Sequence, residues 1–406
     1  MKSVLENMDN CVGCTSCVQI CPQKCISVET DREGFYMPVI DEARCVDCGT
    51  CTRACPVSGG NLREYANPAY VGGERLPAAY ACWSADDQTR LSSTSGGVFS
   101  MLAEEILNSS GIVFGAAFDG DFKVCHSFVS EISGLDRLRR SKYVQSDINN
   151  SFIAVKKLLS DGKEVLFAGT PCQVAGLKAF LGKEYDNLLT CDFACHGVPS
   201  PLIWKMYLEF IKERHKSGIK DISFRDKRSG WLNSSLSIVF ADGNRYEDSV
   251  SNETYMIGFG KSIFTRKSCF NCNFRHKNSR ADITLADFWG FDKFDDKDAS
   301  YNKGVSLAIP NTAKGSSSLM ALGGGKLHIE GRPFETAVKY NPRLAASITE
   351  PALREAFFRD VTGGASFGEL RRKYMDNSSL AYSVKKAVKS LLGKNIVENL
   401  NKLRPH

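Results

Sequence analysis

The sequence lacks the features that would place it in a membrane or an exported compartment. No stretch approaches the ~20 consecutive apolar residues of a membrane-spanning helix, although 43% of the 406 residues are hydrophobic. The first residues, MKSVLENMDNC, contain no apolar core of a secretory signal. We therefore expect a cytoplasmic protein.

The usual nucleotide motifs are also absent. There is no GxGxxG after a strand-like run and no P-loop, and GGGK at residues 323–326 fits a turn better. The net charge of +6 is concentrated at one end, because residues 371–406 contain nine Lys or Arg against two Asp or Glu. This local +7 leaves the remainder near −1. We therefore expect no nucleic-acid binding.

Cysteine, by contrast, is abundant: the chain has 16, and nine lie in the first 55 residues. CVGCTSCVQICP, at residues 11–22, recurs as CVDCGTCTRACP at residues 45–56. In a cytoplasmic protein such runs indicate metal rather than disulfides.

The spacing is that of bacterial ferredoxins with two [4Fe-4S] clusters, in which the fourth cysteine of each run ligates the other cluster. One predicted ligand set is Cys11, Cys14, Cys17 and Cys55, and the other is Cys45, Cys48, Cys51 and Cys21. A pair of zinc sites is the alternative, but zinc ribbons use pairs of cysteines. Cys25 lies outside both runs and is expected to be a packed thiol. A hairpin with its turn at residues 31–34 is expected between the runs.

Beyond residue 78 the pattern alternates short apolar runs with helical stretches, which indicates a mixture of helices and sheet. The expected fold is α+β, with a ferredoxin domain at residues 1–60, a linker at 61–78, a larger α/β domain at 79–345 and a helical basic tail at 346–406. In that tail Leu380, Val384, Val388, Leu391 and Leu392 share one helical face, with lysines opposite. Docking on the domain is the expected role, with peripheral contact to an anionic membrane or an acidic partner as the alternatives.

One cysteine in the larger part lies at a strand-to-helix turn. In LFAGTPCQVAGLKAF, residues 166–180, Cys172 follows an apolar strand and precedes a helical pattern. A helix N-terminus favours the thiolate, so Cys172 is a candidate nucleophile or metal ligand, with a buried thiol as the alternative. The pair Cys269 and Cys272 has metal-pair spacing and needs two further ligands, although such a pair also occurs as a redox dithiol.

Several motifs together resemble the coenzyme F420 hydrogenase/dehydrogenase beta-subunit family, fused to an N-terminal two-cluster ferredoxin. They are STSGG (93–97), RRSKY (139–143), GTPCQ (169–173), ACHGVPS (194–200), KSCFNCNFR (267–275) and ADITLADFWG (281–290). The resemblance covers residues 1 to about 310.

This resemblance implies an iron–sulfur flavoprotein that binds FAD in the large domain. Electrons would pass between the clusters and a small hydride donor or acceptor, such as a deazaflavin or a nicotinamide, and an external carrier or partner redox protein would take part. An electron-transfer subunit without its own substrate is the alternative.

The resemblance also assigns residues. A third [4Fe-4S] cluster is expected on Cys172, Cys195, Cys269 and Cys272, with Cys191 as the alternative to Cys195; Cys82 and Cys125 are expected to be packed thiols. The expected FAD contacts are Ser95, Gly96, Gly97, Lys142, Tyr143, Gly169, Thr170, Pro171 and Gln173. His196 is the candidate catalytic residue, as a proton donor or an influence on the cluster, with a structural hydrogen bond as the alternative.

Overall fold

The computed structural model describes residues 8–58 and 78–376. Most of the expected linker and the amphipathic helix of the tail lie outside these residues. Within the described ranges, no helix is both long enough and apolar enough to cross a bilayer.

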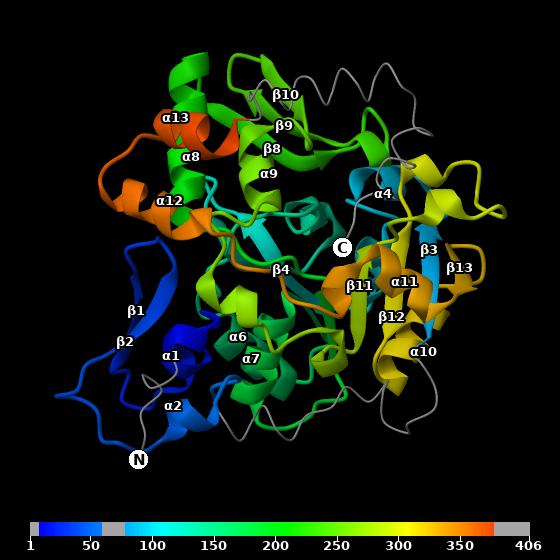
Figure 1. Ribbon diagram of the computed structural model, residues 1–406. Coiled ribbons are helices and arrows are strands. Elements are labelled where there is room, and N and C mark those ends of the chain that lie inside the picture. The colour runs from blue at the N-terminus through cyan, green and yellow to red at the C-terminus, as the bar shows by residue number, and fades with distance from the viewer. Residues whose placement is uncertain (1–7, 59–77, 377–406) are drawn as a thin grey trace, which may run out of the picture.

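The first described segment is a small module built on a hairpin (Figure 1). Strands β1 (Ile26–Thr30) and β2 (Tyr36–Ile40) pair antiparallel. The carboxylate of Asp31 accepts the amides of Glu33 and Phe35, each at 2.9 Å, and Gly34 takes a positive φ of 87°. The predicted hairpin and its turn are therefore confirmed. Two short helices, α1 (Ser16–Ile20) and α2 (Thr50–Arg53), complete the module.

An eight-stranded sheet forms the centre of the larger part. Its order is β13-β3-β12-β11-β7-β6-β4-β5. The four strands from β11 to β4 run parallel to one another, and the flanking strands pair antiparallel. The strands span Ala79–Ser84 (β3), Ile112–Phe118 (β4), Val124–Val129 (β5), Val165–Ala168 (β6), Leu188–Phe193 (β7), Ile283–Asp287 (β11), Ser306–Pro310 (β12) and Leu327–Arg332 (β13).

Helices cover both faces of this sheet, and alternation along β6 shows how. Val165 and Phe167 pack with α6 (Ser151–Ser160) and α7 (Pro171–Leu181), whereas Leu166 packs with α5 (Val98–Asn108) and α10 (Ala313–Ala321). Successive side chains of a strand point to opposite faces, so a continuous apolar run is buried on both sides. The expected strand–helix alternation over residues 112–193 is confirmed.

A second layer packs beyond the sheet (Figure 1). It is a three-stranded antiparallel sheet in the order β10-β9-β8, surrounded by helices. The elements are β8 (Ile219–Asp226), β9 (Ser235–Phe240), β10 (Arg245–Ser249), α8 (Pro201–His215), α9 (Thr254–Gly260), α12 (Leu353–Thr362) and α13 (Phe367–Leu370). Two further helices are α4 (Asp87–Ser92) and α11 (Phe334–Tyr340). The start of the expected tail therefore packs into a core: Phe357 and Met375 are both fully buried. The fold as a whole is α+β, as expected.

Polar contacts hold the small module against the large domain. The Arg266 guanidinium is buried and donates to the carbonyls of Cys11 (2.8 Å) and Tyr36 (3.2 Å). Glu33 forms a two-pronged ion pair with the buried Arg354. The module is therefore docked through charge-assisted bonds, the stronger class of hydrogen bond.

Candidate metal centres

Three of the family-like motifs follow neighbouring parallel strands. GTPCQ follows β6, ACHGVPS follows β7, and the end of ADITLADFWG follows β11. The strands β6, β7 and β11 are adjacent and parallel, so their carboxyl ends meet at one edge of the sheet. Ligands of open α/β sheets bind at this edge. The sequence order of these motifs therefore becomes a spatial cluster.

Four cysteines gather at this edge. The pKa of the Cys195 thiol is raised well above its usual range, first by burial and then by Cys269, Cys172 and Cys272. Burial and the nearby Cys272 likewise raise the pKa of Cys269 to about 11, while the Arg275 guanidinium acts in the opposite direction. Burial and neighbouring thiols therefore keep Cys172, Cys195 and Cys269 protonated, and a bound metal would supply the positive charge that stabilises their thiolates. The donor set fits a cluster with four cysteine ligands.

The two alternative ligands, Cys191 and Cys195, occupy different places in the fold. Cys191 is buried within β7, where it pairs with Ile283 on one side and Ala168 on the other. The groups that affect the pKa of its thiol are Asp282 and Asp192, not the other cysteines. Cys195 lies beyond the end of the strand and joins the group.

The pKa shift of the Cys172 thiol has the opposite direction to the one expected from the sequence. Its position at the start of α7 predicts a lowered pKa, but burial and the neighbouring Cys272 raise that pKa to about 12. Desolvation and like charge outweigh the helix dipole here. The residue is thus no activated nucleophile by itself, and the hydroxyl of Thr170 lies 3.1 Å from its sulfur.

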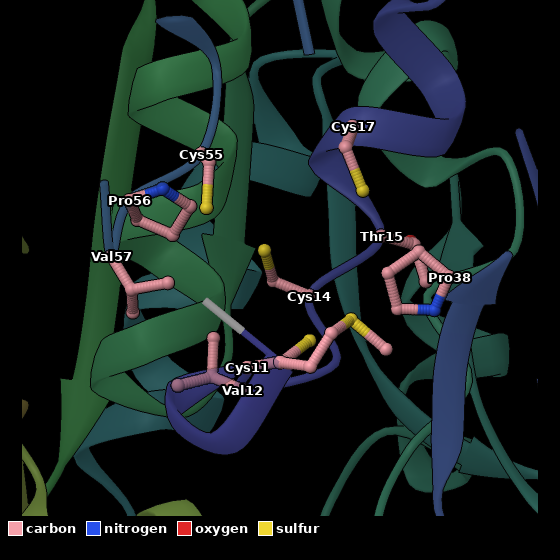
Figure 2. A pocket seen from close by; sticks show the side chains of 10 residues that line it. Cys11, Val12, Cys14, Thr15, Cys17, Pro38, Cys55, Pro56 and Val57 are labelled. Carbon is pink, nitrogen blue, oxygen red and sulfur yellow. The ribbon is translucent and has the colours of Figure 1, made fainter. Parts of the chain in front are cut away.

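The first predicted ferredoxin set lines one pocket. The side chains of Cys11, Cys14, Cys17 and Cys55 line a pocket with about 410 Å³ of empty space, its opening included. Figure 2 shows their sulfur atoms directed into a shared space among apolar residues. The Gly13 amide donates to the Cys11 sulfur at 3.4 Å, a type of bond that tunes cluster potentials. The pocket and its donor set fit a [4Fe-4S] cluster.

The second predicted set lies in a different environment. Cys45 and Cys48 are exposed, and Cys21 and Cys51 are half-buried. Cys25, the cysteine outside the repeat, is buried as expected, but its sulfur lies 3.4 Å from the Cys21 sulfur. Across residues 8–58 and 78–376, no three His, Cys, Asp or Glu side chains are grouped so that they could hold a single metal ion.

The predicted cofactor loops come together although they are far apart in sequence. The Ser141 amide donates to the Thr94 hydroxyl at 2.9 Å, which joins the STSGG turn to the RRSKY segment. The ring of Tyr143 packs on Phe259 at 4.7 Å between centroids, and the ring of His196 packs on the same Phe259 at 4.9 Å. These loops and the third cysteine set therefore belong to one region.

Several of the predicted contacts already have protein partners. The Gly96 amide donates to the Ser306 hydroxyl, and the Ser95 hydroxyl donates to the Val305 carbonyl. Gln173 closes a capping box at the start of α7 by accepting the Thr170 amide. These polar groups are engaged in holding their own turns. Gly97 is the N-cap of α5, Gly169 directly follows β6, and Pro171 is the first residue of α7.

Burial disfavours the charged forms of two predicted site residues, Lys142 and His196. The Lys142 ammonium donates to the carbonyls of Arg139 (2.6 Å) and Arg137 (3.0 Å), and burial lowers its pKa to about 7. Burial, with Arg343 next, lowers the pKa of His196 to about 4, and its ring lies 2.9 Å from the Ser262 hydroxyl. His196 is therefore a neutral imidazole at neutral pH.

Reasoning from the sequence missed three cations that organise this region. Arg275 donates to the Cys195 carbonyl at 2.7 Å, and Arg266 reaches the Cys11 carbonyl. Lys227 donates to three carbonyls, among them that of Ser95 at 2.8 Å. Arg275 ends the KSCFNCNFR motif, but no periodicity or spacing signals the role of any of the three. Their contacts depend on segments more than 75 residues apart.

Comparison with known families agrees with this geometry. Residues 162–331 match the family model for the C terminus of the coenzyme F420 hydrogenase/dehydrogenase beta subunit. Residues 10–58 match a 4Fe-4S dicluster domain, and a second 4Fe-4S dicluster match overlaps it at residues 37–85. Residues 162–331 are thus similar to the C terminus of that beta subunit, and they follow a segment that is similar to a 4Fe-4S dicluster domain. The dicluster matches, together with the cysteine runs, support an iron–sulfur protein.

Among solved structures, this chain is similar to a chain of the F420-reducing [NiFe] hydrogenase complex from Methanosarcina barkeri, at 14% identity and a TM-score of 0.41. The match covers 78% of this chain and 93% of that one. No curated protein matches the sequence.

Proposed function

We propose that this protein is an iron–sulfur flavoprotein oxidoreductase related to the coenzyme F420 hydrogenase/dehydrogenase beta subunit. It would pass electrons between its ferredoxin-type clusters and a bound FAD that exchanges hydride with a deazaflavin, a nicotinamide or another small organic substrate. The observation that carries the proposal is the meeting of Cys172, Cys195, Cys269 and Cys272 at the carboxyl edge of the parallel strands. A redox centre there stands directly beside the loops expected to hold the flavin.

The chain's residues have distinct tasks in this proposal. The three cysteine sets hold the clusters, and Arg275, whose charge partly opposes the burial that raises the pKa of Cys195 and of Cys269, offsets thiolate charge at the third set. FAD, when bound, supplies the conversion between two-electron hydride chemistry and one-electron transfer. Gly169, Thr170 and Pro171 bring backbone close to the ring system, and the start of α5 at Gly97 offers amides to a phosphate.

His196 acts in its neutral form. With a pKa of about 4, it carries no proton to release as an imidazolium at pH 7, and its ring is bonded to Ser262. It would therefore orient a substrate or flavin by a hydrogen bond, or hold a proton only when bound charge raises its pKa. This narrows the role expected from the sequence.

The test is anaerobic reconstitution followed by counting iron and flavin. Four irons per cluster predict about twelve irons, together with one FAD per chain. About eight irons with no flavin contradict both the third cluster and the flavin. About twelve irons without flavin leave the clusters in place and contradict the flavoprotein.

An electron-transfer subunit is the second candidate. The matched family is named for a beta subunit, and two cysteines of the dicluster module are exposed, which suits a partner redox protein. In that case the reconstituted protein has clusters but is not reduced by a deazaflavin or NAD(P)H alone. Bleaching of a bound flavin by either compound favours the enzyme instead.

A further inference from the structure

The two cysteine runs are equivalent in sequence but have unequal surroundings. In the set that lines the pocket, Cys14, Cys17 and Cys55 are 7–8% exposed. In the other set, Cys45 and Cys48 are exposed, and Val46 between them is 61% exposed. We call the first set, Cys11, Cys14, Cys17 and Cys55, the inner set, and the second, Cys21, Cys45, Cys48 and Cys51, the outer set.

The inner set touches helix α7, which begins with a ligand of the third set. A Cβ added to Gly176 would lie 2.8 Å from the Cys14 Cβ and 2.9 Å from its sulfur, so the helix backbone packs directly on Cys14. Gly176 is four residues after Cys172. Residues four apart share one face of a helix, about one turn from each other. Cys172 and Cys14 therefore lie beside the same short stretch of α7.

A second segment of the third set reaches the inner set independently. The Cys11 carbonyl accepts from the Ser268 hydroxyl at 3.0 Å, and Ser268 directly precedes Cys269. The buried side chains of Ala175 and Phe274 pack in one apolar cluster with cysteines of the inner and third sets, and the half-buried Cys21 and Cys51 of the outer set pack against the same cluster. The inner and third sets are therefore neighbours along two chain segments.

The other two outer-set cysteines, Cys45 and Cys48, are exposed and lie outside this apolar cluster. Figure 1 shows the segment between β2 and α2, which carries Cys45 and Cys48, along the outer rim of the molecule. Repeat symmetry would allow either set to stand next to the large domain. Docking through Arg266 and α7 selects the inner one.

We propose that the two dicluster sets have a fixed order, and that the outer set is the port for an external one-electron carrier protein. This rests on the proposed function, because the third set must hold a cluster for the order to connect it. With clusters bound to the three cysteine sets, the inner set would pass single electrons between the third set and the outer set. For each electron that the outer set would gain, a reduced carrier protein would lose one, and the reverse would hold when the flow reverses.

The proposed order of the sets is tested by finding which cysteines become open to alkylation first as the clusters are removed. Reconstituted full-length protein is titrated with ferricyanide and a chelator, with iodoacetamide present, and labelled sites are read by mass spectrometry against remaining iron. We expect Cys45, Cys48, Cys51 and Cys21 to be labelled first, while about eight of twelve irons remain. Labelling of the inner set first, or of both sets together, overturns the order. Absence of a third cluster shows separately, as about eight irons at the start.

The port is tested with Val46→Glu, which places a charge and a longer side chain between two outer ligands. The probe is a bacterial two-[4Fe-4S] ferredoxin, reduced and freed of excess reductant, and cluster bleaching is followed by stopped flow. We expect severalfold slower reduction by the ferredoxin and an unchanged rate with dithionite. The matched control is Leu91→Glu on α4, also exposed at 50%, which should change neither rate. A Val46→Glu protein with full iron and wild-type ferredoxin kinetics overturns the port.

Discussion

Two cysteines four residues apart, Cys191 and Cys195, give the sharpest test of the third metal centre. The sequence leaves both as candidate ligands, and the structure separates them: Cys191 lies inside β7, and Cys195 lies beyond its end beside three other thiols. Replacing Cys195 with Ala removes one of four thiolates. Replacing Cys191 with Ala removes one buried sulfur from a packed strand.

The two substitutions should affect different properties, namely the iron content and the free energy of unfolding. The Cys195→Ala protein should lose the third cluster, which is about four of twelve irons, and keep the two dicluster centres. The Cys191→Ala protein should keep all its iron and lose about 1 kcal/mol of stability through the small cavity that remains.

The assay is iron content with electron paramagnetic resonance of the reduced protein, and anaerobic thermal unfolding as the measure of stability. Cys172→Ser serves as a second ligand variant and should match Cys195→Ala in iron content. Full iron in Cys195→Ala, or the loss of about four irons in Cys191→Ala, would refute the assignment.

The docking contacts and the buried groups support three further predictions. Gly176→Ala should lower the iron content because the added Cβ would meet Cys14, although alanine is the better helix former by roughly 0.5–1 kcal/mol. The control is Gly368→Ala on α13, where an added Cβ finds ordinary contacts at 3.6 Å or more. Unchanged iron content in Gly176→Ala would count against the close approach of α7 to Cys14. Glu33→Gln should destabilise the protein by about 2–3 kcal/mol because the buried Arg354 loses its main partner. The double variant Glu33→Gln with Arg354→Met should lose less stability than the sum of the losses in the two single variants. Additive losses in thermal unfolding would show that the pair is not coupled. Burial lowers the pKa of His126 to about 4, so between about pH 4 and 6.5 the imidazole binds a proton in the unfolded chain but not in the folded chain. The free energy of unfolding should therefore fall as the pH drops through that window, by up to about 3 kcal/mol. His126→Asn should show a shallower fall, and parallel pH curves for the two proteins would contradict the buried neutral imidazole.

The amino-acid sequence alone was enough to predict the features that depend on residues close together in the chain. The repeated cysteine spacing predicts an iron–sulfur dicluster module, which the family comparison confirms, because cluster ligation needs closely spaced thiolates within a few residues. The turn at Asp31 and Gly34 forms through contacts within five residues. The apolar run of β6 and the capping signals of α7 likewise act over short distances.

The tertiary structure decided everything that depends on which surfaces meet. Burial at the edge of the sheet reverses the pKa shift that the α7 dipole alone would give Cys172, because desolvation depends on neighbours from distant segments. The place of Cys195 at a strand end, and of Cys191 inside the strand, comes from the register of β7 between β6 and β11. The two cysteine runs remain equal in sequence until Arg266 and Gly176 dock one of them against the large domain. Local chemistry thus specifies the candidate ligands, while long-range packing specifies which of them lie near one another and how deeply each is buried.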